Sequence, residues 1–219
     1  LALDQRGIAV QVPARVAQSV PTAGVHENRF SLKQDRPKMH HYCHWIFDLD
    51  GTLTVPQHNF EEIRLELGVP PGTLILEYLE QLEASHAHGI RVRLNALESA
   101  LANEARIADG AREVLEILQR RGADIGILTR NTRQNAYNAL ESIGLASFFD
   151  TAHVLGREEH TPKPAPDGIH HLLEQWRGQL AQTVMVGDFH LDLEAGRNAG
   201  VGTVHVAPSS APRWPHLTD

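Results

Sequence analysis

The chain has 219 residues, of which 42% are hydrophobic, enough to bury the core of one or two domains. Its 27 acidic and 20 basic residues give a formal charge of −7, which argues against a general nucleic-acid-binding protein. No apolar run approaches the roughly 20 residues that span a bilayer, so we expect no membrane partner. The only cysteine is Cys43, so no intrachain disulfide is possible, and we expect a reducing, cytoplasmic location.

Residues 1–39 differ from the rest of the chain. They combine three prolines and scattered charges with no sustained apolar period. A secretory signal would show a basic start followed by an apolar block, and this segment has neither in that order. The pattern predicts a disordered N-terminal extension over residues 1–39.

Strand and helix patterns alternate from residue 44 onward. Short apolar runs bounded by turn signals are typical of buried parallel strands. The sequence has five such runs, at residues 44–47, 125–128, 152–155, 183–186 and 202–206. The segments between them have apolar residues at helical spacing, such as Ile169, Leu172, Leu173 and Trp176. The alternation predicts an α/β fold with a doubly wound, Rossmann-like parallel sheet.

The connection between the first two predicted strands is too long for a simple strand-helix-strand unit. Asp48 and Thr129 lie 81 positions apart in the sequence, whereas such a unit needs about 30 residues. The extra residues have a helical apolar pattern, and we expect a small α-helical cap inserted after the first strand. The predicted domains are a core over residues 40–55 and 107–208, a cap over 56–106 and a C-terminal tail over 209–219.

Polar residues follow three of the predicted strands, namely Asp48, Thr129 and Asp188. In parallel α/β sheets the ligand binds beyond the carboxyl ends of the strands, so these residues should converge there. Asp50 lies two residues after Asp48, and the two carboxylates can divide labour between nucleophile or metal ligand and proton shuttle. A helix-cap turn remains an alternative for this segment alone, because Asp, Gly and Thr favour turns and caps.

Four short motifs together resemble those of the haloacid dehalogenase-like (HAD) hydrolase superfamily. Residues 48–54, Asp-Leu-Asp-Gly-Thr-Leu-Thr, resemble motif I of the family, and residues 128–131, Leu-Thr-Arg-Asn, resemble motif II. Residues 163–166, Lys-Pro-Ala-Pro, resemble motif III, and residues 187–192, Gly-Asp-Phe-His-Leu-Asp, resemble motif IV. The resemblance covers about residues 44–207 and includes an insert where the family places its helical cap.

The resemblance implies a catalytic role for each of four residues. Asp48 is expected to attack phosphorus and form an aspartyl-phosphate, and Asp50 to act as general acid and then base. Thr129 is expected to hydrogen-bond a phosphoryl oxygen, and Lys163 to neutralise charge on the transferred group. Lys163 is the only lysine after residue 38, and its compact ammonium suits this task better than a planar guanidinium does.

The resemblance also implies a Mg²⁺ site, since oxygen ligands beside a phosphate suit this hard cation. Its expected ligands are the carboxylates of Asp48 and Asp188 and the backbone carbonyl of Asp50. Asp192 is a second acidic contributor, either to the metal or to Lys163.

The expected contacts with substrate come from four residues after the second and third strands. Besides Thr129 and Lys163 they are Arg130 and Asn131, which complete the second motif. Arg130 is a candidate for reading the leaving group, although it can equally pair with an acidic neighbour.

The expected activity is hydrolysis of a small phosphate monoester, as in phosphoglycolate-phosphatase-like members of the superfamily. Dehalogenases of the superfamily lack the acid at the position of Asp50, which favours phosphoryl chemistry. Phosphonoacetaldehyde hydrolases use a cap lysine, and residues 55–106 contain none. A sugar phosphomutase or phosphotransferase remains an alternative, as does a non-catalytic binding module. The expected partner is a small phosphorylated metabolite, and the sequence gives no oligomeric state.

Overall fold

The computed structural model describes residues 42–57, 59–206 and 213–218. The predicted extension over residues 1–39 lies outside the described residues, as does half of the predicted tail. None of the helices in the described part of the chain is long and apolar enough to cross a membrane.

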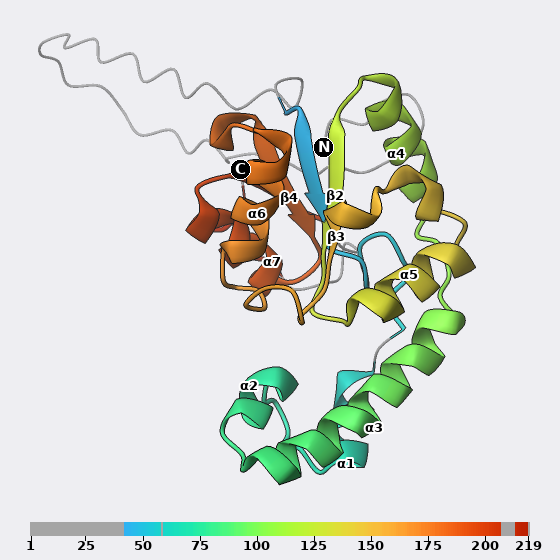
Figure 1. Ribbon diagram of the computed structural model, residues 1–219, viewed down its shortest axis with the longest axis vertical. Helices are drawn as coiled ribbons and strands as arrows, with labels where there is room; N and C mark the ends of the chain where they lie inside the picture. The colour runs from blue at the N-terminus through green and yellow to red at the C-terminus, as the bar shows by residue number, and fades with distance from the viewer. Residues whose placement is uncertain (1–41, 58, 207–212, 219) are drawn as a thin grey trace, which may run out of the picture. The chain divides into compact units, whose positions relative to one another are not determined.

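Five parallel strands form one sheet in the order β3-β2-β1-β4-β5 (Figure 1). The strands are β1 His44–Phe47, β2 Asp124–Leu128, β3 Val154–Leu155, β4 Thr183–Gly187 and β5 Gly202–His205. The α-helices are α1 Phe60–Leu67, α2 Ile75–Glu80, α3 Ala84–Asn103, α4 Ala111–Arg120, α5 Arg133–Ser142, α6 Asp167–Trp176 and α7 His190–Ala199. The predicted doubly wound parallel sheet is therefore confirmed.

The central strand β1 separates two apolar clusters because its side chains alternate between the faces of the sheet. Trp45 and Phe47 pack with residues of α4 and α5 on one face. Ile46 packs with residues of α6 and α7 on the other. Since β2 and β4 flank β1 on opposite sides, the strand order reverses at β1. The carboxyl end of β1 is thus the point where such sheets bind ligands.

The third predicted strand is too long. Residues Thr151–His153 form a 3₁₀ turn, in which the Asp150 carboxylate accepts the backbone N–H of Ala152 at 2.8 Å. Only Val154 and Leu155 pair with β2, so β3 is a two-residue edge strand. The fifth strand ends one residue before its predicted end, at His205.

Four helices lie between β1 and β2, and the first three, α1 to α3, form a helical insert (residues 60–103) with an apolar cluster of its own. The cluster includes Ile63 of α1, Leu79 of α2 and Ile90 of α3. The helix α1 was not predicted from the sequence. It begins where the Asn59 side chain accepts the N–H of Glu62 and ends before a left-handed glycine. The predicted boundaries of cap and core stay predictions.

Candidate active site at the carboxyl edge of the sheet

A buried lysine lies between two buried carboxylates at the carboxyl end of β1. Nζ of Lys163 is 2.6 Å from Oδ1 of Asp48 and 2.6 Å from Oδ1 of Asp192. Only 1% of Lys163 is exposed. A buried ammonium is tolerated where carboxylates compensate its charge. The structure thus brings together three residues that are far apart in the sequence.

The two oxygens of Asp48 have different partners. Oδ1 accepts from Lys163, and Oδ2 accepts from the hydroxyl of Thr52 at 3.2 Å. The backbone N–H of Asp48 donates to the carbonyl of Val186 in β4, which extends the β1 ladder by one residue, to Asp48. The Asp48 carboxylate is therefore fixed at the strand end, facing the edge of the sheet where ligands approach. Thr52 was not predicted as a partner of Asp48, although it lies in the same motif.

Two glycines make the close approach of the acidic residues possible. Gly51 has φ +94°, and a Cβ on it would lie 2.3 Å from Oδ2 of Asp188. A Cβ on Gly187 would lie 2.3 Å from the side chain of Asp192. Neither position tolerates a larger residue without displacing an acid of the site.

The carboxylates of Asp48, Asp188 and Asp192 form a cluster that fits a hard divalent cation. Each offers one oxygen, and these three oxygens lie within 4.8 Å of one another. Oxygen donors of this kind suit Mg²⁺. Both oxygens of Asp192 also have protein partners, since Oδ1 pairs with Lys163 and Oδ2 accepts the N–H of Phe189 at 3.0 Å. Asp192 therefore holds Lys163 and the start of α7 together, and its predicted metal role stays a prediction.

The pKa values show that Lys163 does not neutralise the cluster. Burial, together with the charge of Asp192, raises the pKa of Asp48 to about 6 against the pull of Lys163. Burial and the charges of Asp48 and Asp192 raise the pKa of Asp188 to about 8. Burial alone would lower the pKa of Lys163, but the two carboxylates beside it outweigh burial and raise it. The excess negative charge is what a bound divalent cation would relieve.

We expect the metal-free protein to become more stable when Asp188 loses its charge. A carboxyl with a raised folded-state pKa keeps a proton that the unfolded chain has released, so its contribution to stability falls as the pH rises from about 4 to about 8. Asp188 is partly exposed, so we expect Asp188→Asn to add about 1–2 kcal/mol in EDTA at pH 8, raising the melting temperature by about 3–6 °C.

The difference between Asp188→Asn and the unaltered protein should shrink at pH 5, where the folded protein already keeps this proton. Thermal melts in EDTA at both pH values measure it. The matched control is Asp109→Asn, which changes an exposed aspartate outside the cluster. Equal melting temperatures at pH 8 would contradict the raised pKa of Asp188.

Residues after β2 form a hydrogen-bonded turn that leads to Asp50. The hydroxyl of Thr129 is buried and accepts the N–H of Asn131 at 3.0 Å. Oδ1 of Asn131 accepts from the N–H of Thr132 and from Nδ2 of Asn135, at 2.8 and 3.0 Å. Its Nδ2 donates to Oδ2 of Asp50 at 3.4 Å. Asn131 thus orients Asp50, and its predicted contact with substrate stays a prediction.

Arg130 connects the turn after β2 with the helical insert. One guanidinium nitrogen donates to the backbone carbonyl of Lys163, and Nη2 is 2.8 Å from Oε2 of Glu77 in α2. The alternative that Arg130 pairs with an acidic neighbour therefore describes the structure, and the neighbour is Glu77. The guanidinium also contacts the loop that carries Lys163, and the predicted role of Arg130 in binding the leaving group stays a prediction.

A second arginine, Arg157, holds the insert from the end of β3. Its guanidinium donates to both carboxylate oxygens of Glu98 in α3, at 3.0 and 2.8 Å, and to Oδ1 of Asn95 at 2.5 Å. It also donates to the backbone carbonyl of Arg130 at 2.9 Å. Arg157 was not among the predicted site residues, although its position two residues after Leu155 at the same sheet edge was a signal.

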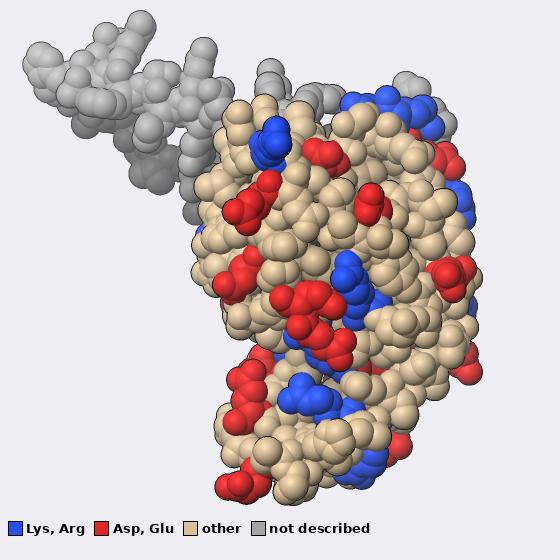
Figure 2. All heavy atoms as spheres, viewed as in Figure 1, with Lys and Arg blue, Asp and Glu red and all other residues tan. Residues whose placement is uncertain are grey.

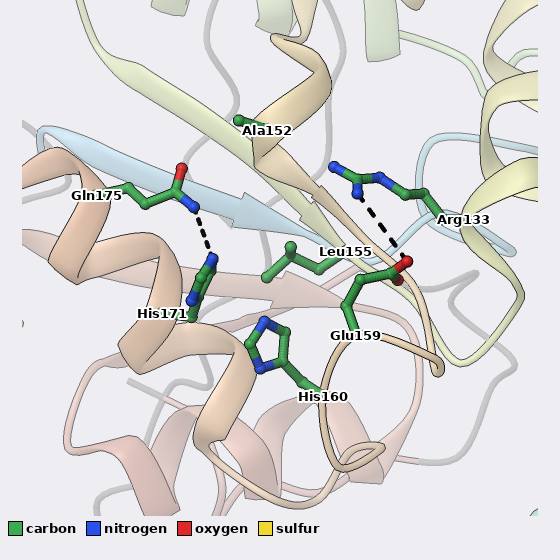
Figure 3. Close-up of a pocket in the computed structure, with 7 residues that line it drawn as sticks. All are labelled: Arg133, Ala152, Leu155, Glu159, His160, His171 and Gln175. Atoms are coloured by element: carbon green, nitrogen blue, oxygen red, sulfur yellow. Dashed lines mark hydrogen bonds and ion pairs between the residues drawn. The ribbon is translucent and has the colours of Figure 1, made fainter.

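The core also has a cavity that is not lined by any of these carboxylates. This cavity of about 360 Å³ beside β3 has seven lining residues (Figure 3): Arg133, Ala152, Leu155, Glu159, His160, His171 and Gln175. The rings of His160 and His171 lie 4.5 Å apart between centroids, and Arg133 and Glu159 form a long ion pair of 4.0 Å. None of the predicted site residues lines this cavity, so it is not where the predicted phosphoryl chemistry would occur.

Comparison with known proteins agrees with the motifs and the fold. The sequence model of the haloacid dehalogenase-like hydrolase family matches residues 54–206. The chain belongs to the haloacid dehalogenase-like hydrolases. The resemblance read from the four motifs is thereby confirmed, and so is the hydrolase class.

The relatives of this HAD hydrolase include one named as a pyrophosphatase. Pyrophosphatase PpaX of Halalkalibacterium halodurans is 33% identical over 183 residues, covering 74% of this chain and 81% of that protein. An uncharacterised hydrolase of Saccharomyces cerevisiae is 27% identical over 165 residues, covering 73% and 74% of the two chains.

Solved structures share the fold of this HAD hydrolase. A HAD hydrolase from Entamoeba histolytica superposes with a TM-score of 0.65 at 18% identity, covering 76% of this chain and 85% of that one. A predicted phosphoglycolate phosphatase from Haemophilus somnus gives 0.58 at 20% identity, covering 77% and 86%. At these identities the likeness concerns the fold.

Proposed function

We propose that this HAD hydrolase is a Mg²⁺-dependent phosphatase that hydrolyses a small phosphate monoester through an aspartyl-phosphate on Asp48. The observation that carries the proposal is the Asp48 carboxylate at the sheet edge, held between the ammonium of Lys163 and the hydroxyl of Thr52. A nucleophile must be held in position. The ammonium beside it must also be able to stabilise the negative charge that develops on the phosphoryl oxygens.

The first half of the reaction transfers the phosphoryl group to Asp48. An oxygen of Asp48 forms a bond to phosphorus while the bond from phosphorus to the ester oxygen breaks. The departing oxygen takes a proton from Asp50, which Asn131 holds at 3.4 Å. Lys163 and the Thr129 hydroxyl interact with the negative oxygens of the transferred group.

The second half of the reaction returns the enzyme to its starting state. Asp50, now ionised, removes a proton from a water molecule that attacks phosphorus. The bond between phosphorus and Asp48 breaks, and inorganic phosphate leaves. Mg²⁺ bound by Asp48, Asp188 and the carbonyl of Asp50 would neutralise phosphoryl charge and align the group for attack.

Charge on the surface does not point to a different class of partner. On the face that Figure 2 presents, acidic and basic side chains are interspersed over the described residues, with no continuous basic stripe. Nucleic-acid binding surfaces are strongly basic on one face. The proposed partner is a small phosphorylated metabolite in the cytoplasm.

A phosphate-release assay with and without metal tests the proposal. We expect phosphate release from at least one compound in a panel that includes 2-phosphoglycolate, pyrophosphate, sugar phosphates and p-nitrophenyl phosphate. We expect EDTA to lower the rate by at least about 100-fold, and added Mg²⁺ to restore it, because the cation supplies several kcal/mol of charge stabilisation.

Two other outcomes are decisive. Isomerisation of a sugar phosphate without phosphate release would show a phosphomutase instead. Equal release with EDTA and with Mg²⁺ would contradict the metal dependence.

A further inference from the structure

Two arginines of the core attach to acids of the helical insert, and the two attachments differ in burial. Only 3% of the Arg157 side chain and 12% of the Glu98 side chain are exposed. For Arg130 and Glu77 the exposed fractions are 21% and 38%. Arg157 contacts both oxygens of Glu98 and also Asn95, whereas Arg130 contacts one oxygen of Glu77. The Arg157 attachment is therefore fixed, while the Arg130 attachment can be exchanged at low cost.

The exchangeable arginine lies beside the reacting groups. Arg130 directly follows Thr129, and its guanidinium donates to the backbone carbonyl of Lys163. The ammonium of the same Lys163 is 2.6 Å from Asp48. Ligands of parallel α/β sheets bind beyond the carboxyl edge, and Arg130 follows β2 at this edge and contacts Glu77 of α2 there. Arg130 thus lies at the same edge of the sheet as Asp48, where the leaving group of a bound substrate would be.

We propose that Arg130 binds an acidic group on the leaving group of the substrate, and that Glu77 occupies this binding position when no substrate is bound. A partly exposed pair of this kind is worth about 0.2–1 kcal/mol, so a substrate carboxylate or second phosphate can displace Glu77. The planar guanidinium binds such groups through two parallel hydrogen bonds, which improves on its single contact with Glu77.

The inference names a substrate class and rests on the proposed phosphatase function. The substrates are phosphate esters or anhydrides whose leaving group carries a carboxylate or phosphate. Such a group gains a contact with Arg130 but must first displace Glu77. A neutral leaving group gains nothing from Arg130 and leaves the Arg130–Glu77 pair intact. Glu77 thus acts as a competitor that sets how strongly acidic substrates are held.

The test compares Glu77→Gln with the unaltered protein on two kinds of substrate. The acidic probes are 2-phosphoglycolate and pyrophosphate, and the neutral probe is p-nitrophenyl phosphate. Removing the competing charge should lower KM for the better acidic probe about 3–5-fold with kcat unchanged. The ratio of kcat/KM between acidic and neutral probes should rise by the same factor. A purely structural role for Glu77 would change kcat for both kinds of substrate together.

Two further variants complete the experiment. Glu80→Gln removes an exposed glutamate from the same helix and should leave the ratio as it is in the unaltered protein. Arg130→Met should lower the ratio at least about fivefold, because it removes a charged hydrogen-bond donor from the leaving group.

The outcomes separate the inference from the function beneath it. An unchanged ratio in Glu77→Gln overturns the inference, as does hydrolysis of p-nitrophenyl phosphate without hydrolysis of either acidic probe. Both results leave the phosphatase function standing. No phosphate release from any compound in the panel overturns the function and the inference together.

Discussion

Asp48→Asn should lower phosphate release by at least about 1,000-fold, since the amide cannot attack phosphorus. The loss is expected in kcat, because the remaining contacts with substrate do not depend on this charge. The measurement is the rate of phosphate release under saturating Mg²⁺ and saturating substrate, with Asp109→Asn as the matched control. A variant that keeps a tenth of the original activity would contradict Asp48 as the nucleophile.

Loss of folding should not explain the effect of Asp48→Asn. Burial raises the pKa of Asp48 to about 6, so its ionised form costs stability at pH 7 and above. Replacing it with a neutral side chain of the same size removes that cost, and Lys163 keeps its contact with Asp192 at 2.6 Å. We expect a melting temperature equal to or above that of the unaltered protein in EDTA at pH 8.

A mimic of the aspartyl-phosphate gives a second readout that does not need turnover. Beryllium trifluoride with Mg²⁺ should bind the unaltered protein through an oxygen of Asp48, and should not bind Asp48→Asn. Protection from thermal unfolding by this mimic, present in the unaltered protein and absent in the variant, would place the intermediate on Asp48.

Local patterns in the sequence account for much of the sheet and of its polar edge. A buried strand followed by a polar residue needs only a few consecutive positions, so Asp48, Thr129 and Asp188 could be placed at strand ends without tertiary information. Their convergence followed from the parallel order of the strands, which the alternating pattern also predicts. Lys163 stood out by composition, as the only lysine after residue 38.

Features that depend on weak or mixed local signals were missed. In α1 the apolar residues Phe60 and Leu65 are exposed while Ile63 and Leu67 are buried, so the segment lacks a clean apolar stripe. The start of the third predicted strand looked extended because Ala152 and His153 precede a genuine apolar pair. Their 3₁₀ turn is stabilised by the Asp150 side chain, a local cap that competes with pairing to β2.

The contacts between core and insert could not be read from the sequence at all. Arg130 and Glu77 are 53 positions apart, and Arg157 and Glu98 are 59 apart. Each pair joins two segments that are far apart in the sequence. The local sequence pattern of either segment carries no information about which residue of the other segment it contacts. The insert carries many charged residues, and choosing Glu77 and Glu98 among them required the packing of α3 against α5 of the core and of α2 against α3.

Lys163→Met should remove activity and also weaken the fold, and the two effects should respond differently to pH. In the unaltered protein Lys163 compensates Asp48 and Asp192, each at 2.6 Å. Without the ammonium, which lowers the pKa values of Asp48 and Asp188, burial and the neighbouring carboxylates raise both pKa values further. Breaking a buried ion pair in this way costs about 3–5 kcal/mol, or about 6–15 °C in melting temperature.

The sign of the pH dependence follows from which state holds the protons. In the Met variant the folded state keeps protons on Asp48 and Asp188 that the unfolded chain releases above about pH 4. The loss of stability should therefore be largest at pH 8 and much smaller at pH 5, whereas activity should stay at least about 1,000-fold down at both values. A loss of stability equal at pH 5 and pH 8 would contradict compensation by Lys163.

Lys163→Arg separates charge from shape in the same site. The arginine restores a positive charge between the carboxylates, but its planar guanidinium is wider than the ammonium that fits a side chain only 1% exposed. We expect it to recover part of the stability lost in Lys163→Met while activity stays at least about 100-fold down, since a displaced cation no longer meets the phosphoryl oxygens. Full activity in this variant would show that the site needs only a charge here, and that the geometry of the ammonium has no part in the reaction.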